Sequence, residues 1–304
     1  MKKYTNHIKP VIKLNDIQRG ALKQYKNYVL SGAFKYEEIN CKNCDSYDFN
    51  VILNNDRYGI DYKLVICNKC GLLLSNPRLD KESLNIFYER LYRKLYTGNE
   101  IASSSFFYKQ YQKGKIIYEY LKPFLKNKKQ KESLVVEVGC GAGGILKYFN
   151  EKGYEVKGYD LNKQYIQYGK DKYNLDLNYG TIDSIPKTSK PYIIIYADVL
   201  EHISDINQEL NKIYSTLTEN GIFYIALPGI KNLHFSYDMD IKKLHQNAHL
   251  YIFSLQTLIN ILTKNKFLYI SGNEKIKAIF SKNTSSDVFI EYDDGNSKSI
   301  KNYL

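Results

Sequence analysis

The sequence lacks the features of a membrane protein or a secreted protein. Its 304 residues contain no run of about 18 apolar side chains, the length that a helix needs to cross a bilayer. The N-terminus, Met-Lys-Lys-Tyr-Thr-Asn-His, has no apolar core of a secretory signal peptide. We therefore expect no membrane span and a cytoplasmic location.

Cysteine is scarce, and its distribution is informative. Of five cysteines, four form two Cys-x-x-Cys pairs: Cys41, Cys44, Cys67 and Cys70. In a chain without a secretion signal, paired thiols indicate a reducing compartment, where they bind metal and form no disulfides. Two such pairs can supply the four thiolates of a closed tetrahedral zinc site. Cysteines that are merely small buried hydrophobes would not share this spacing, so we expect structural Zn²⁺.

Acidic residues are too few to balance the basic ones. There are 44 lysines and arginines against 32 acidic residues, so the formal net charge is +12. Eight lysines gather between residues 104 and 133, at positions 109, 113, 115, 122, 126, 128, 129 and 131. Such a stripe can contact the phosphates of a nucleic acid or of a nucleotide-linked substrate. It can equally be a solvated helix face that ends in a lysine-rich linker, and we favour that interpretation.

The apolar pattern divides the chain into three segments. Residues 1–78 contain an N-terminal segment and a zinc ribbon, in which each Cys-x-x-Cys knuckle is expected at the tip of a β-hairpin. Residues 79–130 are predicted to be a helical connector that begins at Asp80, an N-cap, and includes a helix over 105–125. Residues 131–304 form the largest predicted domain.

In this third segment, predicted strands and helices alternate, as in a parallel sheet covered by helices. The sequence therefore predicts a Rossmann-like α/β fold with seven strands that ends in an antiparallel hairpin. The polar tail, residues 293–304, is expected to be frayed. The predicted strands are 134–138, 154–159, 177–181, 192–196, 221–227, 267–271 and 287–292, and the predicted helices are 144–152, 163–173, 207–217 and 255–264.

A glycine-rich loop follows the first of these strands, with the sequence Gly-Cys-Gly-Ala-Gly-Gly at residues 139–144. Glycines here let the backbone turn tightly and pass close to a ligand at the start of the next helix. Taken alone, the loop fits a dinucleotide as well as S-adenosylmethionine. Asp160, at the end of the second strand, suits both, because either cofactor needs a carboxylate on its ribose hydroxyls.

Three motifs in order separate these alternatives: Val-Val-Glu-Val-Gly-Cys-Gly-Ala-Gly, then Gly-Tyr-Asp160, then Ala-Asp-Val-Leu-Glu-His202. Over residues 134–270 the chain resembles the class I S-adenosylmethionine-dependent methyltransferases. The resemblance implies an enzyme with a seven-stranded methyltransferase sheet and S-adenosyl-L-methionine as cofactor. The cofactor-binding residues that it implies are Glu137, Gly139, Gly141, Gly143, Asp160, Asp183 and Asp198.

The N-terminal half is similar to bacterial methyltransferases with an N-terminal zinc module, a group associated with sugar and surface-polysaccharide biosynthesis. In its sugar C-methyltransferases a Tyr-x-Glu-His motif precedes a Tyr-Phe-Ser element. Here His249 keeps the histidine position, whereas Gln246 and Ala248 replace the tyrosine and the glutamate. The resemblance therefore implies O-methylation of a small-molecule or glycan acceptor, a sugar or nucleotide-linked sugar.

Three histidines are candidates for the catalytic base: His249, His202 and His245. A neutral imidazole suits proton removal from a hydroxyl near neutral pH. Once the zinc and loop positions are filled, no cysteine remains for covalent attack on a pyrimidine, and an Asn/Asp-Pro-Pro-Tyr element for amine methylation is absent. Two alternatives stay open: an RNA methyltransferase, such as the ribosomal-RNA enzymes with a zinc module, and a non-catalytic zinc-ribbon binding protein.

Overall fold

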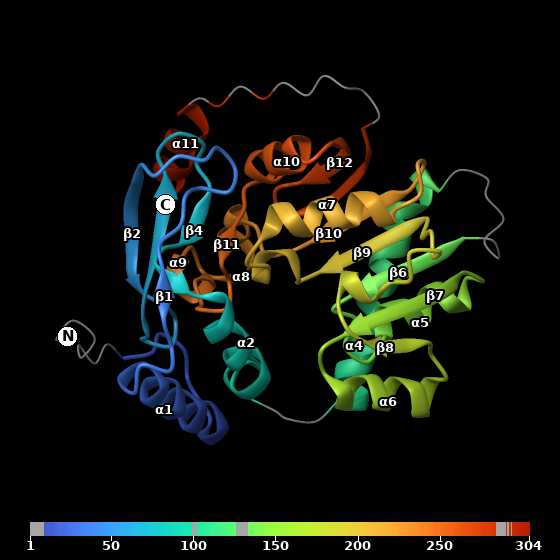
Figure 1. Cartoon of the computed structure of the whole chain (residues 1–304), viewed down its shortest axis with the longest axis horizontal. Coiled ribbons are helices and arrows are strands. Elements are labelled where there is room, and N and C mark those ends of the chain that lie inside the picture. Colours follow the sequence, from blue (N-terminus) through green and yellow to red (C-terminus); the bar gives the residue numbers. More distant parts are fainter. Residues whose placement is uncertain (1–8, 99–101, 126–132, 284–289, 291, 293) are drawn as a thin grey trace. The chain divides into compact units, whose positions relative to one another are not determined.

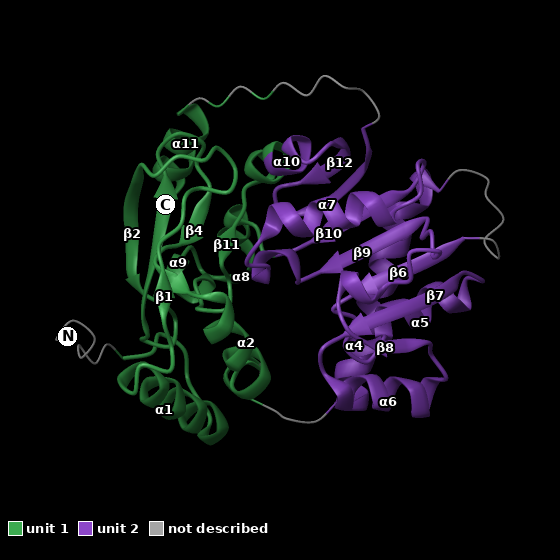
Figure 2. Ribbon diagram, viewed as in Figure 1, with its two compact units in different colours: residues 1–100, 228–260, 290–304 green, residues 101–227, 261–289 purple. Residues whose placement is uncertain are grey.

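The computed structural model describes residues 9–98, 102–125, 133–283, 290, 292 and 294–304, and the chain forms two compact units. Unit 1 contains residues 1–100, 228–260 and 290–304, and unit 2 contains residues 101–227 and 261–289 (Figure 2). The segments expected from the sequence, with divisions after residues 78 and 130, differ from these units. Two late stretches of the chain fold with the N-terminal part.

Within the described ranges, we find no helix that combines the length and the apolarity that a membrane span requires.

Unit 2 contains the seven-stranded sheet that the sequence predicted. Its strand order is β12-β13-β10-β9-β6-β7-β8, and all strands are parallel except β13 (Figure 1). The order reverses between β6 and β9, and in open α/β sheets ligands bind beyond the carboxyl ends of the strands at such a point. The strands are β6 (Leu134–Val138), β7 (Glu155–Asp160), β8 (Leu177–Tyr179), β9 (Ile193–Ala197), β10 (Ile222–Ala226), β12 (Phe267–Asn273) and β13 (Lys277–Lys282).

The last strand of this sheet differs from the prediction. The sequence suggested residues 287–292, but the strand that pairs with β10 and β12 is β13. Its centre is Ala278-Ile279-Phe280, three side chains that are fully buried, and this burial explains why the sheet takes up this stretch. Most of the expected strand (residues 287–289 and 291) lies outside the described residues.

Helices cover both faces of the sheet of unit 2. On one face, α4 (Ser104–Leu121), α5 (Gly144–Glu151) and α6 (Lys163–Tyr173) share a core with the strands that includes Ile117, Leu146 and Ile193. On the other face lies α7 (Ile206–Thr216), where Tyr196 of β9 donates a 2.6 Å hydrogen bond to Glu209. The α10 helix (Leu255–Lys264) crosses the division between the units. Short 3₁₀ turns are η1 (Lys122–Phe124), η3 (Ile182–Ser184) and η4 (Leu200–His202).

Unit 1 is built on an antiparallel sheet with the order β11-β4-β3-β2. A smaller sheet pairs β1 with β5. The strands are β1 (Tyr36–Glu37), β2 (Phe49–Asn55), β3 (Asp61–Cys67), β4 (Leu73–Ser75), β5 (Arg78–Leu79) and β11 (Tyr251–Ile252), and the helical elements are α1 (Asp16–Leu30), α2 (Lys81–Arg90), α3 (Tyr92–Thr97), η5 (Ile230–Asn232), α8 (Leu233–Ser236), α9 (Ile241–Leu244) and α11 (Gly295–Tyr303).

The ends of unit 1 confirm one local prediction and correct another. Asp80 caps α2 as expected, since its side chain accepts a 2.8 Å hydrogen bond from the amide of Ser83. The tail predicted to be frayed is instead the helix α11. Its Ile300 is only 3% exposed and packs in a cluster with Leu64 and Leu73 of the ribbon sheet. This contact with the sheet supplies the apolar burial that the polar tail lacks by itself.

Candidate active site and metal centre

The glycine-rich loop of unit 2 joins β6 to α5 in a conformation that depends on glycine. Gly139 and Gly141 have φ values of 74° and 55°, which side-chain-bearing residues rarely adopt. A Cβ atom at Gly139 would collide with Cγ2 of Val199, whereas one at Gly141 would meet its nearest neighbours only at 3.6 Å. The loop therefore turns tightly at Gly139, and the positive φ of Gly141 disfavours a side chain there.

Asp160, at the end of β7, is held against this loop. Its Oδ2 accepts a hydrogen bond from the amide of Gly141 at 2.8 Å, and its Oδ1 accepts one from the amide of Asn162 at 2.7 Å. The residue is 7% exposed. A carboxylate can accept about four hydrogen bonds, several of them at once. Its carboxylate is thus fixed beside the glycine-rich loop, at the position where the sequence predicted a ribose acceptor.

Glu137, in β6, is a buried carboxylate whose Oε2 has no hydrogen-bond partner among the described residues. It is only 2% exposed. Burial raises its pKa well above the usual range, the positive charge of Lys113 lowers it, and the charges of Asp160 and Asp198 raise it. A buried acceptor without a partner costs roughly 1–3 kcal/mol. Because a ligand ammonium would remove that cost, Glu137 fits the amino end of S-adenosylmethionine.

The remaining predicted cofactor residues lie on the loops at the same edge. Asp198 follows β9 in the left-handed region, at φ 60°, and forms a 2.5 Å ion pair with Lys113 of α4. Asp183 lies in η3 and pairs with Lys212 at 2.6 Å. Gly143 is the N-cap of α5. Strained backbone at a non-glycine residue is common at functional sites, so Asp198 is the stronger candidate of the two aspartates.

His202, the first of the three candidate bases in the sequence, ends the turn η4 of unit 2. Its Nε2 lies 3.8 Å from Oε1 of Glu201, and its side chain is 11% exposed. Glu201 is fully buried, and burial raises its pKa well above the usual range.

The other two candidate bases belong to unit 1, in the segment 245–249. Nε2 of His245 lies 2.8 Å from the carbonyl oxygen of Tyr62, and burial lowers the pKa of His245 to about 4. Nε2 of His249 lies 2.5 Å from Nε2 of the Gln246 side chain. His245 is therefore neutral and anchored to β3, whereas His249 contacts the Gln246 side chain. Of the two, His249 stays the predicted base.

The same segment contains an unsatisfied amide. Asn247 is 1% exposed, and neither its side-chain nitrogen nor its side-chain oxygen has a hydrogen-bond partner among the described residues. Its backbone amide donates to Asp56, whose pKa burial raises to about 7. Nearby, the Tyr58 hydroxyl donates to Gln246 at 3.4 Å. The segment thus places several uncharged polar groups in the interior of unit 1. The sequence analysis did not identify Tyr58 or Asn247.

The four paired cysteines meet in unit 1, as the spacing predicted. The Sγ atoms of Cys41 and Cys70 lie 3.5 Å apart, those of Cys44 and Cys67 lie 3.4 Å apart, and all four fall within 4.8 Å of one another. A zinc ion with Zn–S bonds of about 2.3 Å needs tetrahedral S–S edges of about 3.8 Å. The thiols are free and buried, so the cluster matches a closed zinc site and has no open position for water.

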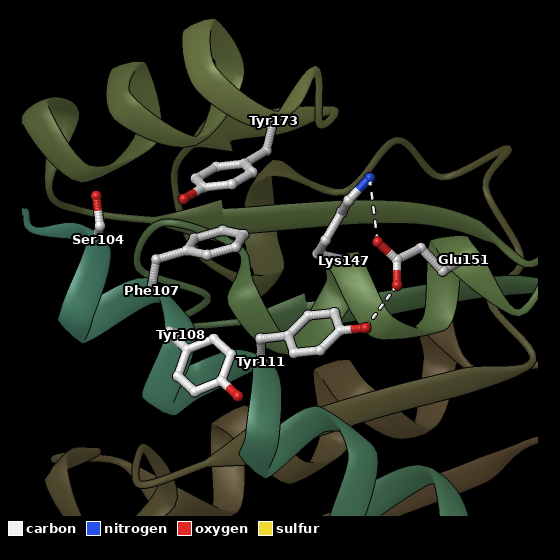
Figure 3. Close-up of a pocket in the computed structure, with 7 residues that line it drawn as sticks. All are labelled: Ser104, Phe107, Tyr108, Tyr111, Lys147, Glu151 and Tyr173. Carbon is white, nitrogen blue, oxygen red and sulfur yellow. Dashed lines mark hydrogen bonds and ion pairs between the residues drawn. The ribbon is translucent and has the colours of Figure 1, made fainter.

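Unit 2 also has a pocket between α4 and α5, with a volume of about 340 Å³ (Figure 3). Three of its polar side chains interact with one another: the Tyr111 hydroxyl donates to Glu151 at 2.6 Å, and Lys147 lies 3.5 Å from the same carboxylate. They therefore indicate no particular ligand. The lining residues come from α4, α5 and the end of α6: Ser104, Phe107, Tyr108, Tyr111, Lys147, Glu151 and Tyr173.

Comparisons with known proteins point to one family. A sequence profile described as a methyltransferase domain matches residues 108–271, which is more than half of the chain. The ubiquinone biosynthesis O-methyltransferase of Rhodopseudomonas palustris (strain HaA2) is 29% identical over 97 residues, which cover 30% of this chain and 38% of that protein. An uncharacterized methyltransferase of Alkaliphilus oremlandii is 30% identical over 100 residues, which cover 32% and 46%. The chain thus spans less than half the length of these relatives.

Two solved structures are similar to the chain at low sequence identity. The PH0226 protein of Pyrococcus horikoshii OT3 is 17% identical, with a TM-score of 0.46, and the match covers 63% of this chain and 97% of that one. The plantazolicin methyltransferase BpumL, in complex with SAH, is 14% identical, with a TM-score of 0.47 and coverage of 67% and 91%. With the profile match and the sheet order taken together, the chain belongs to the methyltransferase domain family, and its unit 2 has the Rossmann-like fold of class I S-adenosylmethionine-dependent methyltransferases.

Proposed function

We propose that the protein transfers a methyl group from S-adenosylmethionine to an acceptor and binds this cofactor at the carboxyl edge of β6, β7 and β9. The observation that carries the proposal is the buried oxygen of Glu137, which has no hydrogen-bond partner in the part of the chain that the structure describes. It lies in the strand that leads into the turn at Gly139 and Gly141, and Asp160 is hydrogen-bonded to the same turn. S-adenosylmethionine requires an acceptor for its ammonium group, a backbone that it can approach closely and an acceptor for its ribose hydroxyls.

The residues of this site would orient the cofactor. Glu137 would hold the ammonium of the methionine portion, and Asp160 would accept hydrogen bonds from the ribose hydroxyls. The cofactor itself supplies an activated methyl group on a sulfonium. The protein therefore has to align the acceptor with that methyl group and to remove the proton that the acceptor loses. Asp183 and Asp198 remain candidates for the adenine side and the methionine side.

For the acceptor we propose a sugar or a nucleotide-linked sugar that is methylated on oxygen, in surface-polysaccharide biosynthesis. Unit 1 supports this class because Asn247, Tyr58 and Gln246 offer uncharged donors and acceptors, which suit sugar hydroxyls. His249 would take the proton of the hydroxyl. Ala248 cannot act as the acidic group that the resemblance associates with C-methylation.

The four-cysteine cluster would hold zinc in a structural role. Four thiolates fill a tetrahedral site, so that the metal would support folding and make no contact with the reacting atoms. Reduced thiols also suit the predicted cytoplasmic location.

Two measurements test the proposal. Calorimetry with S-adenosylhomocysteine should show binding to the purified protein, and NAD should not compete. Methyl-labelled S-adenosylmethionine should then transfer its label to nucleotide sugars or glycans, detected by mass spectrometry. Label that appears in RNA with steep salt dependence would favour the RNA methyltransferase instead. The absence of binding would leave the chain as a zinc-ribbon binding protein.

A further inference from the structure

Lys113 was considered in the sequence only as one of eight lysines in a basic stripe, and the structure gives it a specific partner. It lies on α4, and its Nζ donates to Oδ2 of Asp198 at 2.5 Å. The pair is accessible to a ligand, because the two side chains are 30% and 50% exposed. Asp198 occupies the left-handed region at φ 60°, so that its position after β9 is one that the fold has to hold against strain.

Around Glu137, acidic side chains outnumber the basic side chain that acts on it. The charged groups that influence the pKa of Glu137 are Lys113, which lowers it, and Asp160 and Asp198, which raise it. Lys113 is thus the cation among three carboxyl groups from β6, β7 and the end of β9. The methionine portion of S-adenosylmethionine carries one ammonium and one carboxylate. The carboxyl groups can hold the ammonium, but the carboxylate requires a cation.

The fold fixes the place of Lys113 through its neighbour. Gly114 packs against α5 so closely that a Cβ atom would lie 2.7 Å from the carbonyl oxygen of Ile145. Two turns earlier on α4, the carbonyl oxygen of Phe107 would lie 2.6 Å from a Cβ atom at Gly144, the first residue of α5. Since α5 begins where the glycine-rich loop ends, α4 presents Lys113 at a set distance from that loop.

We propose that Lys113 binds the carboxylate of the methionine portion of S-adenosylmethionine and exchanges Asp198 for that carboxylate when the cofactor enters. The inference deepens the proposed function and rests on it. An ion pair that already forms without a ligand keeps the ammonium of Lys113 oriented toward the site. Once released, Asp198 can join Glu137 in contacting the ligand ammonium, so that the number of paired charges rises on binding.

The test uses calorimetry with three ligands that differ only at the methionine end. S-adenosylhomocysteine has both charged groups, its decarboxylated form keeps the amine alone, and methylthioadenosine has neither. Lys113→Met should weaken S-adenosylhomocysteine binding by about 10- to 100-fold, the worth of a charge-assisted hydrogen bond. Its affinity for the other two ligands should stay within about two-fold of the parent, because neither ligand carries a carboxylate.

The control is Lys109→Met, which removes an exposed lysine from the same helix and should leave all three affinities unchanged. Lys113→Arg, which keeps the charge, should restore part of the lost affinity. If Lys113→Met weakens all three ligands equally, or none, the assignment is wrong, and thermal unfolding of the variant shows whether α4 still folds. If the parent protein binds none of the three, the proposed function itself fails. The two failures are therefore distinguishable.

Discussion

The backbone amide of Gly141 donates a 2.8 Å hydrogen bond to the carboxylate of Asp160, 19 positions further along the chain. This bond ties the glycine-rich loop after β6 to the end of β7, the neighbouring strand. A residue that was predicted only as a ribose acceptor thus also shapes the loop that the cofactor must approach. Loss of Asp160 should therefore affect the protein before any ligand binds.

The first prediction concerns Asp160→Ala. It should weaken S-adenosylhomocysteine binding by about 1.5–3 kcal/mol, since both the ribose contact and the bond to Gly141 are charge-assisted. Asp160→Asn should lose less binding affinity, because the side-chain oxygen of asparagine can still accept a hydrogen bond from one backbone amide. Calorimetry measures both. Asp171→Ala, on the exposed face of α6, is the control and should bind as the parent does. Unchanged affinity in Asp160→Ala would show that the ribose lies elsewhere.

Glu137→Gln should weaken cofactor binding and raise the free energy of unfolding. Burial raises the pKa of Glu137 in the folded protein, so between its usual pKa near 4.5 and the raised value the folded state holds more protons than the unfolded state. Over that window the parent loses stability as the pH rises, whereas the glutamine variant does not. The variant should therefore be the more stable of the two at pH 7, and the difference should shrink as the pH falls toward 4.5.

Denaturant unfolding at several pH values checks this sign, and the matched calorimetric measurement should show a loss of cofactor affinity of about 10- to 100-fold. In the parent, a ligand ammonium would favour the ionised carboxylate, so binding near neutral pH should release a proton. Binding enthalpies in two buffers with different ionisation heats would detect that proton. Equal stability of parent and variant at every pH would contradict the raised pKa.

The alternating sheet could be predicted from sequence because its strands are short apolar runs between helices of regular period, as in β6 and β9. The glycine loop and Asp160 followed from motif spacing. The place of residues 228–260 could not be predicted, because β11 joins the ribbon through only two paired residues, Tyr251 with Leu74 and Ile252 with Leu73. Lys113 was one of eight lysines in a charged stretch, and only the folded contact with Asp198 distinguishes it.

Cys67→Ser should remove zinc and unfold unit 1 under conditions in which the parent is folded. Zinc in small four-ligand modules contributes about 10–16 kcal/mol of apparent binding free energy, which is then lost to folding. Elemental analysis should find one zinc per parent chain and less in the variant. Cys140→Ser is the control. Cys140 lies in the glycine-rich loop of unit 2, so this variant should retain the metal. A fully stable Cys67→Ser variant would rule out a structural metal at this cluster.

The C-terminal helix should slow the loss of that metal. Asn296 of α11 donates a 2.7 Å hydrogen bond to the carbonyl of Cys70, and Lys301 donates one of the same length to Asn68 between the paired cysteines. Asn296→Ala should cost about 1 kcal/mol and speed zinc release to a chelator, measured with a colorimetric indicator. Asn302→Ala, at an exposed position of the same helix, should release zinc at the parent rate. Equal rates for both variants would show that α11 does not hold the knuckle.

His249→Ala should lower turnover by about 10²–10⁴-fold, the usual effect of removing a general base. Its affinity for S-adenosylhomocysteine should not change, because a general base acts on the acceptor and is not among the proposed cofactor contacts, Glu137 and Asp160. His245→Ala is the contrasting variant: with a pKa of about 4 and a bond to Tyr62, His245 anchors the segment, so its loss should reduce the free energy of unfolding. Single-turnover methyl transfer, calorimetry and unfolding are measured on both. If His249→Ala keeps its turnover within a few-fold while His202→Ala loses turnover alone, His202 is the base.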